Sequence, residues 1–310
     1  MQVQGRVIIC DTIDDVGISI LKKAGLVVDY KPDIELDELL TSVGDCDVIV
    51  VRSRTKITKT IIDAASKVKI IARVGVGLDN IDTNYAHSRG IKVLNAAEAA
   101  MNAVSELVIG HMLALSRNIP KANDGIKNGK WLKKELVGSE LKAKYLGIIG
   151  VGNIGRNVGR LARCFRMNLI GYDIFPINQD YVREVGMIKT DLKTLLENSD
   201  FVTCHVPLTE NTWHLMNSET LSYMKPTAFL INTSRGEIID EESLFRTLSE
   251  KRIAGAALDV FEVEPPTNTK LLHLPNILCS PHIAAQTKEA QELASNVIAE
   301  KIIQTLLTNK

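Results

Sequence analysis

The amino-acid sequence predicts an α/β fold made of two doubly wound parallel sheets. Short apolar runs alternate with helical patterns of apolar residues along the whole chain, as in open parallel sheets. The runs are rich in β-branched residues and lack polar alternation, which is typical of strands buried on both faces. A length of 310 residues also favours about two domains of roughly 150 residues each.

The first series of strands and helices begins at Val7. Apolar residues at helical spacing predict helices around 16–21, 36–40 and 61–65, between the apolar runs. The expected strands are Val7–Cys10, Val27–Val28, Val48–Val51, Ile70–Ala72 and Ile91–Leu94.

A long helix is expected next, because apolar residues recur from Val104 to Leu115 at intervals of three and four. Pro120 disfavours helix at the residue before it, so this helix should stop near Asn118. Residues 121–144 are rich in Lys, Gly and Asn, and we expect an exposed, irregular excursion around Trp131.

A second series begins at Tyr145 and predicts the second sheet. Its expected strands are Leu146–Ile149, Leu169–Tyr172, Phe201–Cys204, Phe229–Ile231, Ala256–Leu258 and Ile277–Cys279. Apolar residues at helical spacing then predict one helix over Thr287–Leu307.

Composition argues against several classes of function. The 37 Lys+Arg balance 37 Asp+Glu, and a zero formal charge disfavours bulk electrostatic binding to nucleic acid. No apolar run approaches the roughly 18 residues of a membrane span, and the N-terminus lacks a signal-peptide pattern. The five cysteines are scattered without a C-x-x-C pair, which argues against disulfides or a metal site and favours the reducing cytoplasm.

The segment GVGNIG at 150–155 matches the pattern G-x-G-x-x-G between an expected strand and a helical pattern. Gly150 would allow the tight turn, Gly152 would let a pyrophosphate approach the backbone, and Gly155 would let the helix pack closely on the strand. The phosphates would sit at the helix N-terminus, beside the free N–H groups of residues such as Asn153 and Ile154. The pattern therefore predicts a dinucleotide site.

Asp173 supplies the second half of this dinucleotide pattern, at the end of the next expected strand. A carboxylate there accepts hydrogen bonds from the ribose hydroxyls of NAD and repels the 2′-phosphate of NADP. The predicted cofactor is therefore NAD.

Longer stretches then identify a family. They read VVRSRTK at 50–56, RVGVGLDN at 73–80, NTSRG at 232–236, AALDVFEVEPP at 256–266 and SPH at 280–282. From about residue 48 onward, the chain resembles the D-isomer-specific 2-hydroxyacid dehydrogenases, and among them the D-3-phosphoglycerate dehydrogenases. The resemblance implies a flavodoxin-like substrate domain of residues 1–96 plus 286–310 and a Rossmann NAD-binding domain of residues 97–285. It also implies an active-site cleft between these domains.

The family's chemistry assigns three catalytic residues by resemblance. Oxidation of a 2-hydroxy acid removes the hydroxyl proton while a hydride leaves C2, and histidine is the usual base for such a proton. His282 is the expected base, Glu264 would orient its imidazole, and Arg235 would bind the substrate carboxylate. We expect structural roles for the other five histidines, with His111 a satisfied residue of the core.

The resemblance also implies binding residues. Further cofactor contacts are expected from Val206, Pro207, Thr233 and Asp259. The expected substrate contacts are Arg52, Ser53, Arg73, Val76 and Gly77, with Asn102 nearby, in addition to Arg235. The arginines that follow strands would meet anionic groups of the substrate, because ligands of open α/β sheets bind beyond the carboxyl ends of the strands.

The first functional hypothesis is NAD-dependent oxidation of 3-phospho-D-glycerate to 3-phosphohydroxypyruvate in serine biosynthesis. Within the same class, the alternatives are a glyoxylate or hydroxypyruvate reductase, or another D-2-hydroxyacid dehydrogenase. A different class is a non-catalytic, NAD-sensing protein similar to the transcriptional corepressors built on this fold. The resemblance implies a homodimer, and because the sequence stops at Lys310 we expect no C-terminal regulatory domain and no serine feedback through one.

Overall fold

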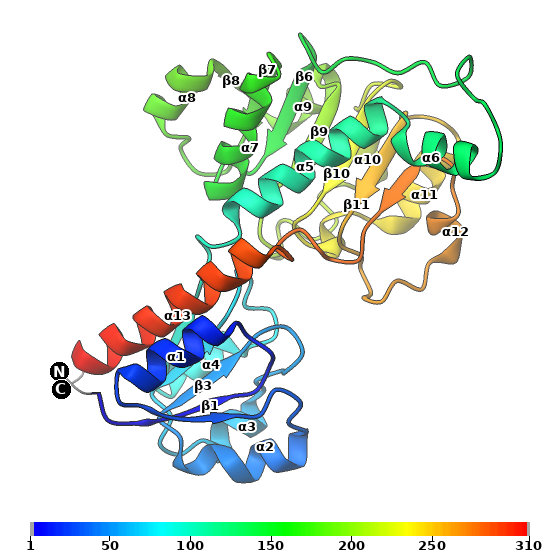
Figure 1. The fold of residues 1–310 in the computed structure, drawn as a ribbon. Helices are drawn as coiled ribbons and strands as arrows, with labels where there is room; N and C mark the ends of the chain where they lie inside the picture. The colour runs from blue at the N-terminus through cyan, green and yellow to red at the C-terminus, as the bar shows by residue number, and fades with distance from the viewer. Residues whose placement is uncertain (1–2, 309–310) are drawn as a thin grey trace. The chain divides into compact units, whose positions relative to one another are not determined.

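The computed structural model describes residues 3–308, which divide into two compact units (Figure 1). Unit 1 comprises the residues up to Ala100 together with those from Ala285 onward, and unit 2 is Met101–Ala284. Each unit holds one sheet in which every paired strand is parallel. The expected α/β class with two doubly wound sheets is confirmed.

Unit 1 contains a five-stranded sheet in the order β2-β1-β3-β4-β5. The strands are β1 (Arg6–Ile9), β2 (Val27–Tyr30), β3 (Val48–Val51), β4 (Ile70–Arg73) and β5 (Lys92–Asn95). The helices are α1 (Asp15–Lys23), α2 (Leu36–Ser42), η1 (Val43–Asp45, a 3-10 turn), α3 (Lys59–Ala64), α4 (Thr83–Ser88) and α13 (Lys288–Thr308). The strand order reverses between β1 and β3, and such a switch point is where open sheets bind ligands.

Alternate residues of each central strand of unit 1 enter two different cores. Val7 and Ile9 of β1 pack in the core that holds α1 and α13, whereas Ile8 packs with α2, α3 and α4 on the other face. Ile298 and Ile302 of α13 are 1% and 0% exposed, so α13 forms part of the unit 1 core although it follows unit 2 in sequence.

Unit 2 contains a seven-stranded sheet in the order β12-β11-β10-β9-β6-β7-β8. The strands are β6 (Tyr145–Ile149), β7 (Asn168–Tyr172), β8 (Met187–Lys189), β9 (Phe201–Cys204), β10 (Phe229–Asn232), β11 (Gly255–Leu258) and β12 (Ile277–Cys279). The strand order reverses between β6 and β9, which makes their carboxyl ends the expected ligand-binding edge.

Helices cover both faces of the unit 2 sheet. One core joins the sheet to α5 (Met101–Ser116), α7 (Asn153–Cys164) and α8 (Gln179–Val185). The other core joins it to α9 (Leu192–Asn198), α10 (Ser218–Ser222), α11 (Glu241–Ser249) and α12 (Thr269–Leu272). A second 3-10 turn, η2 (Gly236–Ile238), follows β10.

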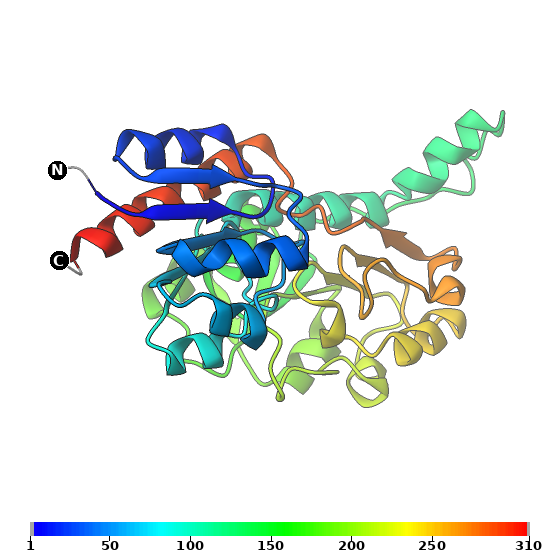
Figure 2. The same ribbon diagram turned by 90° about the horizontal axis from the view of Figure 1, so that it is seen from below.

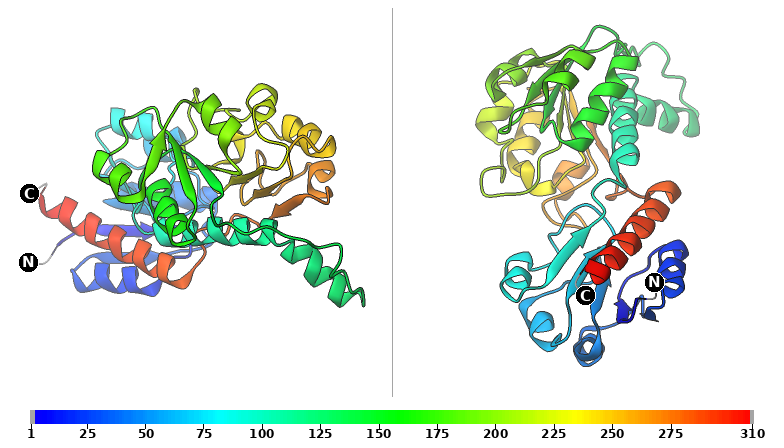
Figure 3. Two further views of the ribbon diagram at one scale, coloured as in Figure 1. Left: turned by 90° about the horizontal axis from the view of Figure 1, so that it is seen from above. Right: turned by 90° about the vertical axis from the view of Figure 1, so that its left-hand side faces the viewer.

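Two local expectations were incomplete. The segment 121–144 was expected to be irregular, but its start belongs to helix α6 (Ile119–Lys127), which extends away from the sheet of unit 2 in Figures 2 and 3. Pro120 lies in the first turn of α6, where the N–H that proline lacks would have no partner within the helix. Strand β8 was missed because three residues at the edge of a sheet leave little periodic signal.

No helix in residues 3–308 has both the length and the apolar character needed to cross a lipid bilayer.

Candidate functional site

The glycine loop lies between β6 and α7, beside the switch point of unit 2. Gly150 has a φ of 89°, and a Cβ there would lie 2.8 Å from the carbonyl carbon of His205. A Cβ on Gly155 would lie only 2.1 Å from the oxygen of Gly150, so the helix can approach the loop only with glycine there. A Cβ on Gly152 would meet no heavy atom within 4 Å, which leaves open space beside the first turn of α7.

Asp173 follows β7 and is connected directly to the glycine loop. Its Oδ2 accepts the N–H of Val151 at 2.7 Å, and its Oδ1 accepts the N–H of Phe175 at 2.9 Å. A carboxylate has about four lone-pair positions, so it can still accept hydrogen bonds from a ribose. Asp173 can thus hydrogen-bond to the glycine loop and to a ribose at the same time.

Three further candidate cofactor residues follow strands at the same edge. Val206 and Pro207 follow β9, and Cγ1 of Val206 lies 2.8 Å from where a Cβ of Gly150 would be. Thr233 follows β10, is 8% exposed, and its Oγ1 has no hydrogen-bond partner among residues 3–308. Buried hydroxyl groups in folded proteins usually have a hydrogen-bond partner, and a bound ligand can supply one. The open space at Gly152 and this unpaired hydroxyl both fit a dinucleotide.

His282 and Glu264 form a hydrogen-bonded pair in unit 2. Nδ1 of His282 lies 2.7 Å from Oε2 of Glu264, whose Oε1 accepts the N–H of Phe261 at 3.2 Å. The carboxylate therefore fixes the proton on Nδ1 and leaves Nε2 as the nitrogen that can exchange a proton. His282 has a φ of 53°, a left-handed conformation that needs support from its surroundings.

Asp259 provides this support. It follows β11, is 0% exposed, and accepts hydrogen bonds from the Ser280 hydroxyl at 2.6 Å, the Ile283 N–H at 2.9 Å and the Ala284 N–H at 2.8 Å. Its own carbonyl oxygen accepts the N–H of His282 at 2.8 Å. Sequence reasoning placed Asp259 among the cofactor contacts; in the structure its carboxylate anchors both sides of the turn that carries His282.

Arg235 lies in the loop after β10, between that strand and η2. Its Nη1 donates to the Ser234 carbonyl oxygen at 2.6 Å. At the next residue, a Cβ on Gly236 would lie 1.9 Å from the carbonyl carbon of Phe261. Glycine at 236 therefore lets the loop of Arg235 touch the backbone of the loop that leads to Glu264.

A second group of predicted residues lies in unit 1, at the carboxyl ends of β3 and β4. Nε of Arg73 donates to the Arg52 carbonyl oxygen at 2.9 Å, and Nη1 of Arg73 donates to the Gly77 carbonyl oxygen. Nη2 of Arg52 donates to Oε1 of Gln286 at 2.9 Å. Among the hydrogen bonds within residues 3–308, none uses the N–H groups of Val76 or Gly77, so these two donors can bind an anion.

Sequence reasoning missed Asp11, the acid that organises this group. Asp11 follows β1, is 3% exposed, and accepts the N–H of Arg52 at 2.6 Å and the hydroxyl of Thr55 at 2.6 Å. Nε of Arg54 lies 3.4 Å from its Oδ1. The available signal was an aspartate directly after the predicted strand Val7–Cys10, because Asp173 and Asp259 also directly follow predicted strands.

The predicted substrate residues do not all belong to one unit. Arg52, Ser53, Arg73, Val76 and Gly77 lie in unit 1, and Ser53 is exposed. Asn102 lies in the first turn of α5 in unit 2, where its Oδ1 accepts a hydrogen bond from Asn157 Nδ2 at 3.2 Å.

Two of the remaining histidines sit near the candidate residues of unit 2. Nε2 of His205 lies 3.0 Å from the Thr203 hydroxyl, and burial lowers the pKa of His205 to about 4. His111 is 5% exposed, but its Nδ1 has no hydrogen-bond partner in the described part of the chain. His111 is a buried residue of the core, as expected, but of its two ring nitrogens only Nε2 has a partner within residues 3–308, so its hydrogen bonding is satisfied in part.

One group of three possible metal ligands lies close together in residues 3–308. Ligand atoms of His214, Asp240 and Glu262 are all within 4.8 Å of one another. These groups already serve the protein itself: Asp240 caps α11, and Oε1 of Glu262 accepts the N–H of Glu241 at 3.0 Å and lies 3.0 Å from Nε2 of His214. Structural hydrogen bonding accounts for the cluster.

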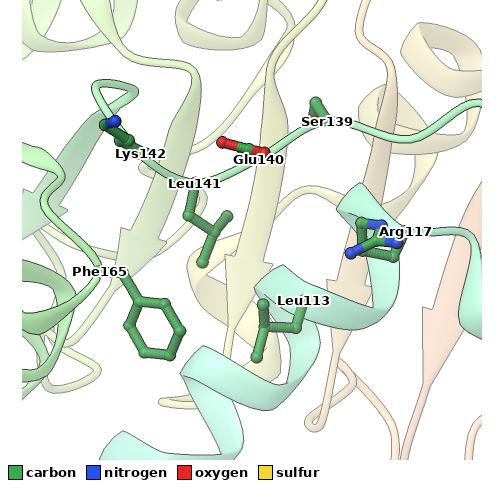
Figure 4. A pocket seen from close by; sticks show the side chains of 7 residues that line it. All are labelled: Leu113, Arg117, Ser139, Glu140, Leu141, Lys142 and Phe165. Carbon is green, nitrogen blue, oxygen red and sulfur yellow. The ribbon is translucent and has the colours of Figure 1, made fainter.

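A shallow pocket of about 230 Å³ lies elsewhere in unit 2 (Figure 4). Leu113 of α5, Leu141 before β6 and Phe165 after α7 supply its apolar side chains, and Arg117 and Lys142 lie on its edge. It shares no residue with the glycine loop or the turn of His282, so it is separate from the candidate site.

Comparisons with known proteins identify the family of the chain. Residues 109–284 match the family model of the D-isomer specific 2-hydroxyacid dehydrogenase, NAD binding domain. The chain is 43% identical over 302 residues to D-3-phosphoglycerate dehydrogenase of Methanocaldococcus jannaschii, which covers 97% of this chain and 57% of that protein. It is 44% identical over 304 residues to hydroxypyruvate reductase of Thermotoga maritima, which covers 97% and 98%.

A solved structure shares the fold. The crystal structure of D-lactate dehydrogenase from Aquifex aeolicus, complexed with NAD and lactic acid, matches with a TM-score of 0.86 and 28% identity, over 98% of this chain and 96% of that chain. The chain spans a little more than half the length of the curated D-3-phosphoglycerate dehydrogenases that it matches first, at 57% and 54%.

Proposed function

The chain belongs to the D-isomer-specific 2-hydroxyacid dehydrogenase family, and on that premise we propose that it oxidises 3-phospho-D-glycerate to 3-phosphohydroxypyruvate in an NAD-dependent reaction. The observation that carries the proposal is the His282–Glu264 pair, whose turn is anchored on a buried aspartate in the NAD-binding domain. A base held in one tautomer is what removal of a hydroxyl proton requires.

His282 acts on the substrate hydroxyl in this proposal. Its Nε2 takes the proton, because Nδ1 is engaged with Glu264. Glu264 stabilises the imidazolium that forms, and the planar guanidinium of Arg235 binds the substrate carboxylate. When bound at the glycine loop and Asp173, NAD supplies the acceptor for the hydride that leaves C2 of the substrate.

Unit 1 is the substrate domain in this proposal. The N–H groups of Val76 and Gly77 are two adjacent donors for a carboxylate. Arg52 and Arg73 supply fixed positive charge beside them, which favours a second anionic group on the substrate such as a phosphate. The curated D-3-phosphoglycerate dehydrogenases at 43% identity support the same substrate.

A second candidate function is reduction of hydroxypyruvate, and one observation favours it. The hydroxypyruvate reductase of Thermotoga maritima is matched over 98% of its length, whereas the phosphoglycerate dehydrogenases are matched over little more than half of theirs. The two candidates differ in whether the substrate carries a phosphate.

The experiment is a substrate panel. NAD reduction is followed with 3-phospho-D-glycerate, D-glycerate, D-lactate and glycolate, and NADH oxidation with hydroxypyruvate and 3-phosphohydroxypyruvate. We expect the highest kcat/KM for the phosphorylated pair. If D-glycerate matches its phosphate ester, the reductase candidate replaces the first; if NAD binds and no acid is turned over, the chain is a non-catalytic NAD-binding protein.

We further propose a cytoplasmic homodimer in which α6 and the segment after it contact a second copy of the chain. Ile126, Trp131 and Val137 are 60%, 78% and 83% exposed along this projecting segment, an exposure typical of apolar side chains that a partner covers. The five free cysteines fit a reducing compartment.

The dimer is tested by measuring the mass of the protein in sedimentation. Trp131→Glu should lower this mass, whereas Val27→Glu, an exposed control in unit 1, should leave it unchanged. A monomeric unmodified chain would contradict the dimer.

A further inference from the structure

His111 is a polar residue on the buried face of α5. It is 5% exposed, and Val108 and Met112, its neighbours on the same face, are both 0% exposed. Its Nδ1 has no hydrogen-bond partner in residues 3–308, while its Nε2 lies 3.3 Å from Oγ of Ser280. A buried nitrogen without a partner destabilises a fold relative to an apolar side chain, so the contact made by Nε2 must matter.

The hydrogen-bond pattern decides which atom carries the proton. The Ser280 hydroxyl has one proton and donates it to Oδ1 of Asp259 at 2.6 Å. Its oxygen can then only accept from His111, so Nε2 of His111 carries a hydrogen and Nδ1 is bare. Burial also lowers the pKa of His111, which keeps the ring neutral. The result is one directed chain of donors from His111 through Ser280 to Asp259.

This chain of donors ends on the anchor of the base. Ser280 precedes His282 by two residues, and Asp259 also accepts the N–H groups of Ile283 and Ala284 on the other side. We propose that His111 is a positioning residue whose Nε2–H holds the Ser280 hydroxyl on Asp259 and thereby fixes the turn that presents His282. The expected change in kcat rests on the proposed dehydrogenase activity, whereas the hydrogen bond between His111 and Ser280 does not.

Three variants test the kinetic consequence. His111→Leu removes the donor and fits the apolar face, Ser280→Ala removes the relay, and His111→Gln keeps an N–H donor the same number of bonds from the backbone. We expect kcat to fall about fivefold in His111→Leu, the loss of one neutral hydrogen bond, with KM for NAD unchanged and no fall in Tm. His111→Gln should restore most of kcat, and His111→Leu should add no loss to Ser280→Ala.

A full kcat in His111→Leu would overturn the proposal, and so would a loss of Tm without a loss of kcat, which is the behaviour of a merely structural residue. Equal kcat in the His111→Leu and His111→Gln variants would also overturn it, because the N–H donor of residue 111, and not the shape of its side chain, must be what matters. Additive losses in the variant that combines His111→Leu with Ser280→Ala would overturn it too, because the donor must act through Ser280.

A spectroscopic measurement separates failure of this inference from failure of the proposed function. In 15N-histidine-labelled protein, the His111 signals, assigned by their loss in His111→Gln, should show a neutral ring protonated on Nε2. An Nδ1–H tautomer overturns the inference even if the enzyme is active. If no acid in the panel is turned over, the Nε2–H tautomer and its loss of protection from exchange in Ser280→Ala decide the hydrogen bond alone.

Discussion

Unit 1 and unit 2 each hold a candidate functional loop on a buried aspartate that lies one or two residues after a strand, but the two carboxylates have different partners. In unit 1, Asp11 receives backbone and hydroxyl donors from the loop after β3, and Arg54 lies 3.4 Å away as a charged partner. In unit 2, the donors to Asp259 within the described residues are two N–H groups and a hydroxyl, all neutral.

The difference agrees with the roles proposed for the two loops. The loop of unit 1 carries Arg52, and the ion pair with Arg54 compensates the charge of Asp11, which suits the anion site proposed for this unit. The turn of unit 2 carries His282, the proposed base, which would become positive when it takes a proton. The donors to Asp259 bring no formal positive charge to that turn, so they do not oppose the charge that the base would acquire. In the proposed function, the same anchoring device would thus serve an anion site in one unit and a proton acceptor in the other.

The largest expected effect tests the role of unit 2. His282→Ala should lower kcat about 1,000-fold, because a positioned general base contributes between a hundredfold and ten-thousandfold. NAD binding and Tm should change little. His273→Ala, at an exposed histidine after α12, is the control and should keep full activity. Activity within tenfold of the unmodified chain would show that another group takes the proton.

Exchanging the two anchors tests the comparison itself. Asp259→Asn and Asp11→Asn each leave donors facing an amide, and each should destabilise its unit by about 2 kcal/mol. We expect Asp259→Asn to lower kcat and Asp11→Asn to raise KM for the acid, measured in the same steady-state assay. If both variants change the same constant, the two anchors do not serve different steps.

Arg52→Ala should raise KM for 3-phospho-D-glycerate about tenfold, because a charge-assisted hydrogen bond is lost. KM for D-glycerate should change less, because that acid lacks the phosphate. Lys56→Ala, at an exposed cation of the same loop, is the matched control. Equal effects on both acids would remove Arg52 from phosphate recognition.

Asp173→Asn should shift the cofactor preference by about tenfold toward NADP, because the repulsion of the 2′-phosphate is removed. The asparagine keeps one oxygen that can accept the Val151 N–H, so the glycine loop should hold its shape. The measurement is the ratio of kcat/KM for NAD to that for NADP. An unchanged ratio would place the ribose elsewhere.

The smallest expected effect is a loss of stability of unit 2 at acidic pH. Burial lowers the pKa of His205 to about 4, below its ordinary value of 6.5, so the unfolded chain binds this proton more readily. The contribution of His205 to stability is complete above pH 6.5 and is lost as the pH falls from 6.5 toward 4. Since the side chain is only half-buried, we expect a loss of about 1 kcal/mol in unit 2 near pH 5.

Both tryptophans, Trp131 and Trp213, lie in unit 2, so urea unfolding followed by tryptophan fluorescence reports on that unit. His205→Gln should flatten the dependence on pH. An unfolding midpoint that is constant from about pH 7 to about pH 5 would contradict the expectation.

Sequence reasoning recovered the parts of the fold that depend on local pattern. The buried strand Val48–Val51 and the glycine loop carry their own signals, because burial on both faces and a close helix approach each restrict residue type. It missed α6, because Pro120 in the first turn of this helix resembles a stop signal, and it missed β8, which is too short to show a period.

The roles of buried polar residues could not be read in the same way. Asp11 and Asp259 act on loops that follow other strands, so their partners are 41 and 21 residues or more away in sequence. His111 and Ser280 are 169 residues apart. Such contacts depend on the order of strands in the sheet, and no local pattern encodes that order.

Helix α13 has a consequence for how the chain is made. It packs on α1, β4 and β5, and its Ile298 and Ile302 belong to the unit 1 core, but the ribosome adds all of unit 2, residues 101–284, before it. At about 5–20 residues per second, the apolar face of the unit 1 sheet emerges many seconds before its cover. During synthesis unit 2 can therefore fold first. The part of the unit 1 sheet that α13 covers stays exposed to solvent until α13 has been made and can pack on it.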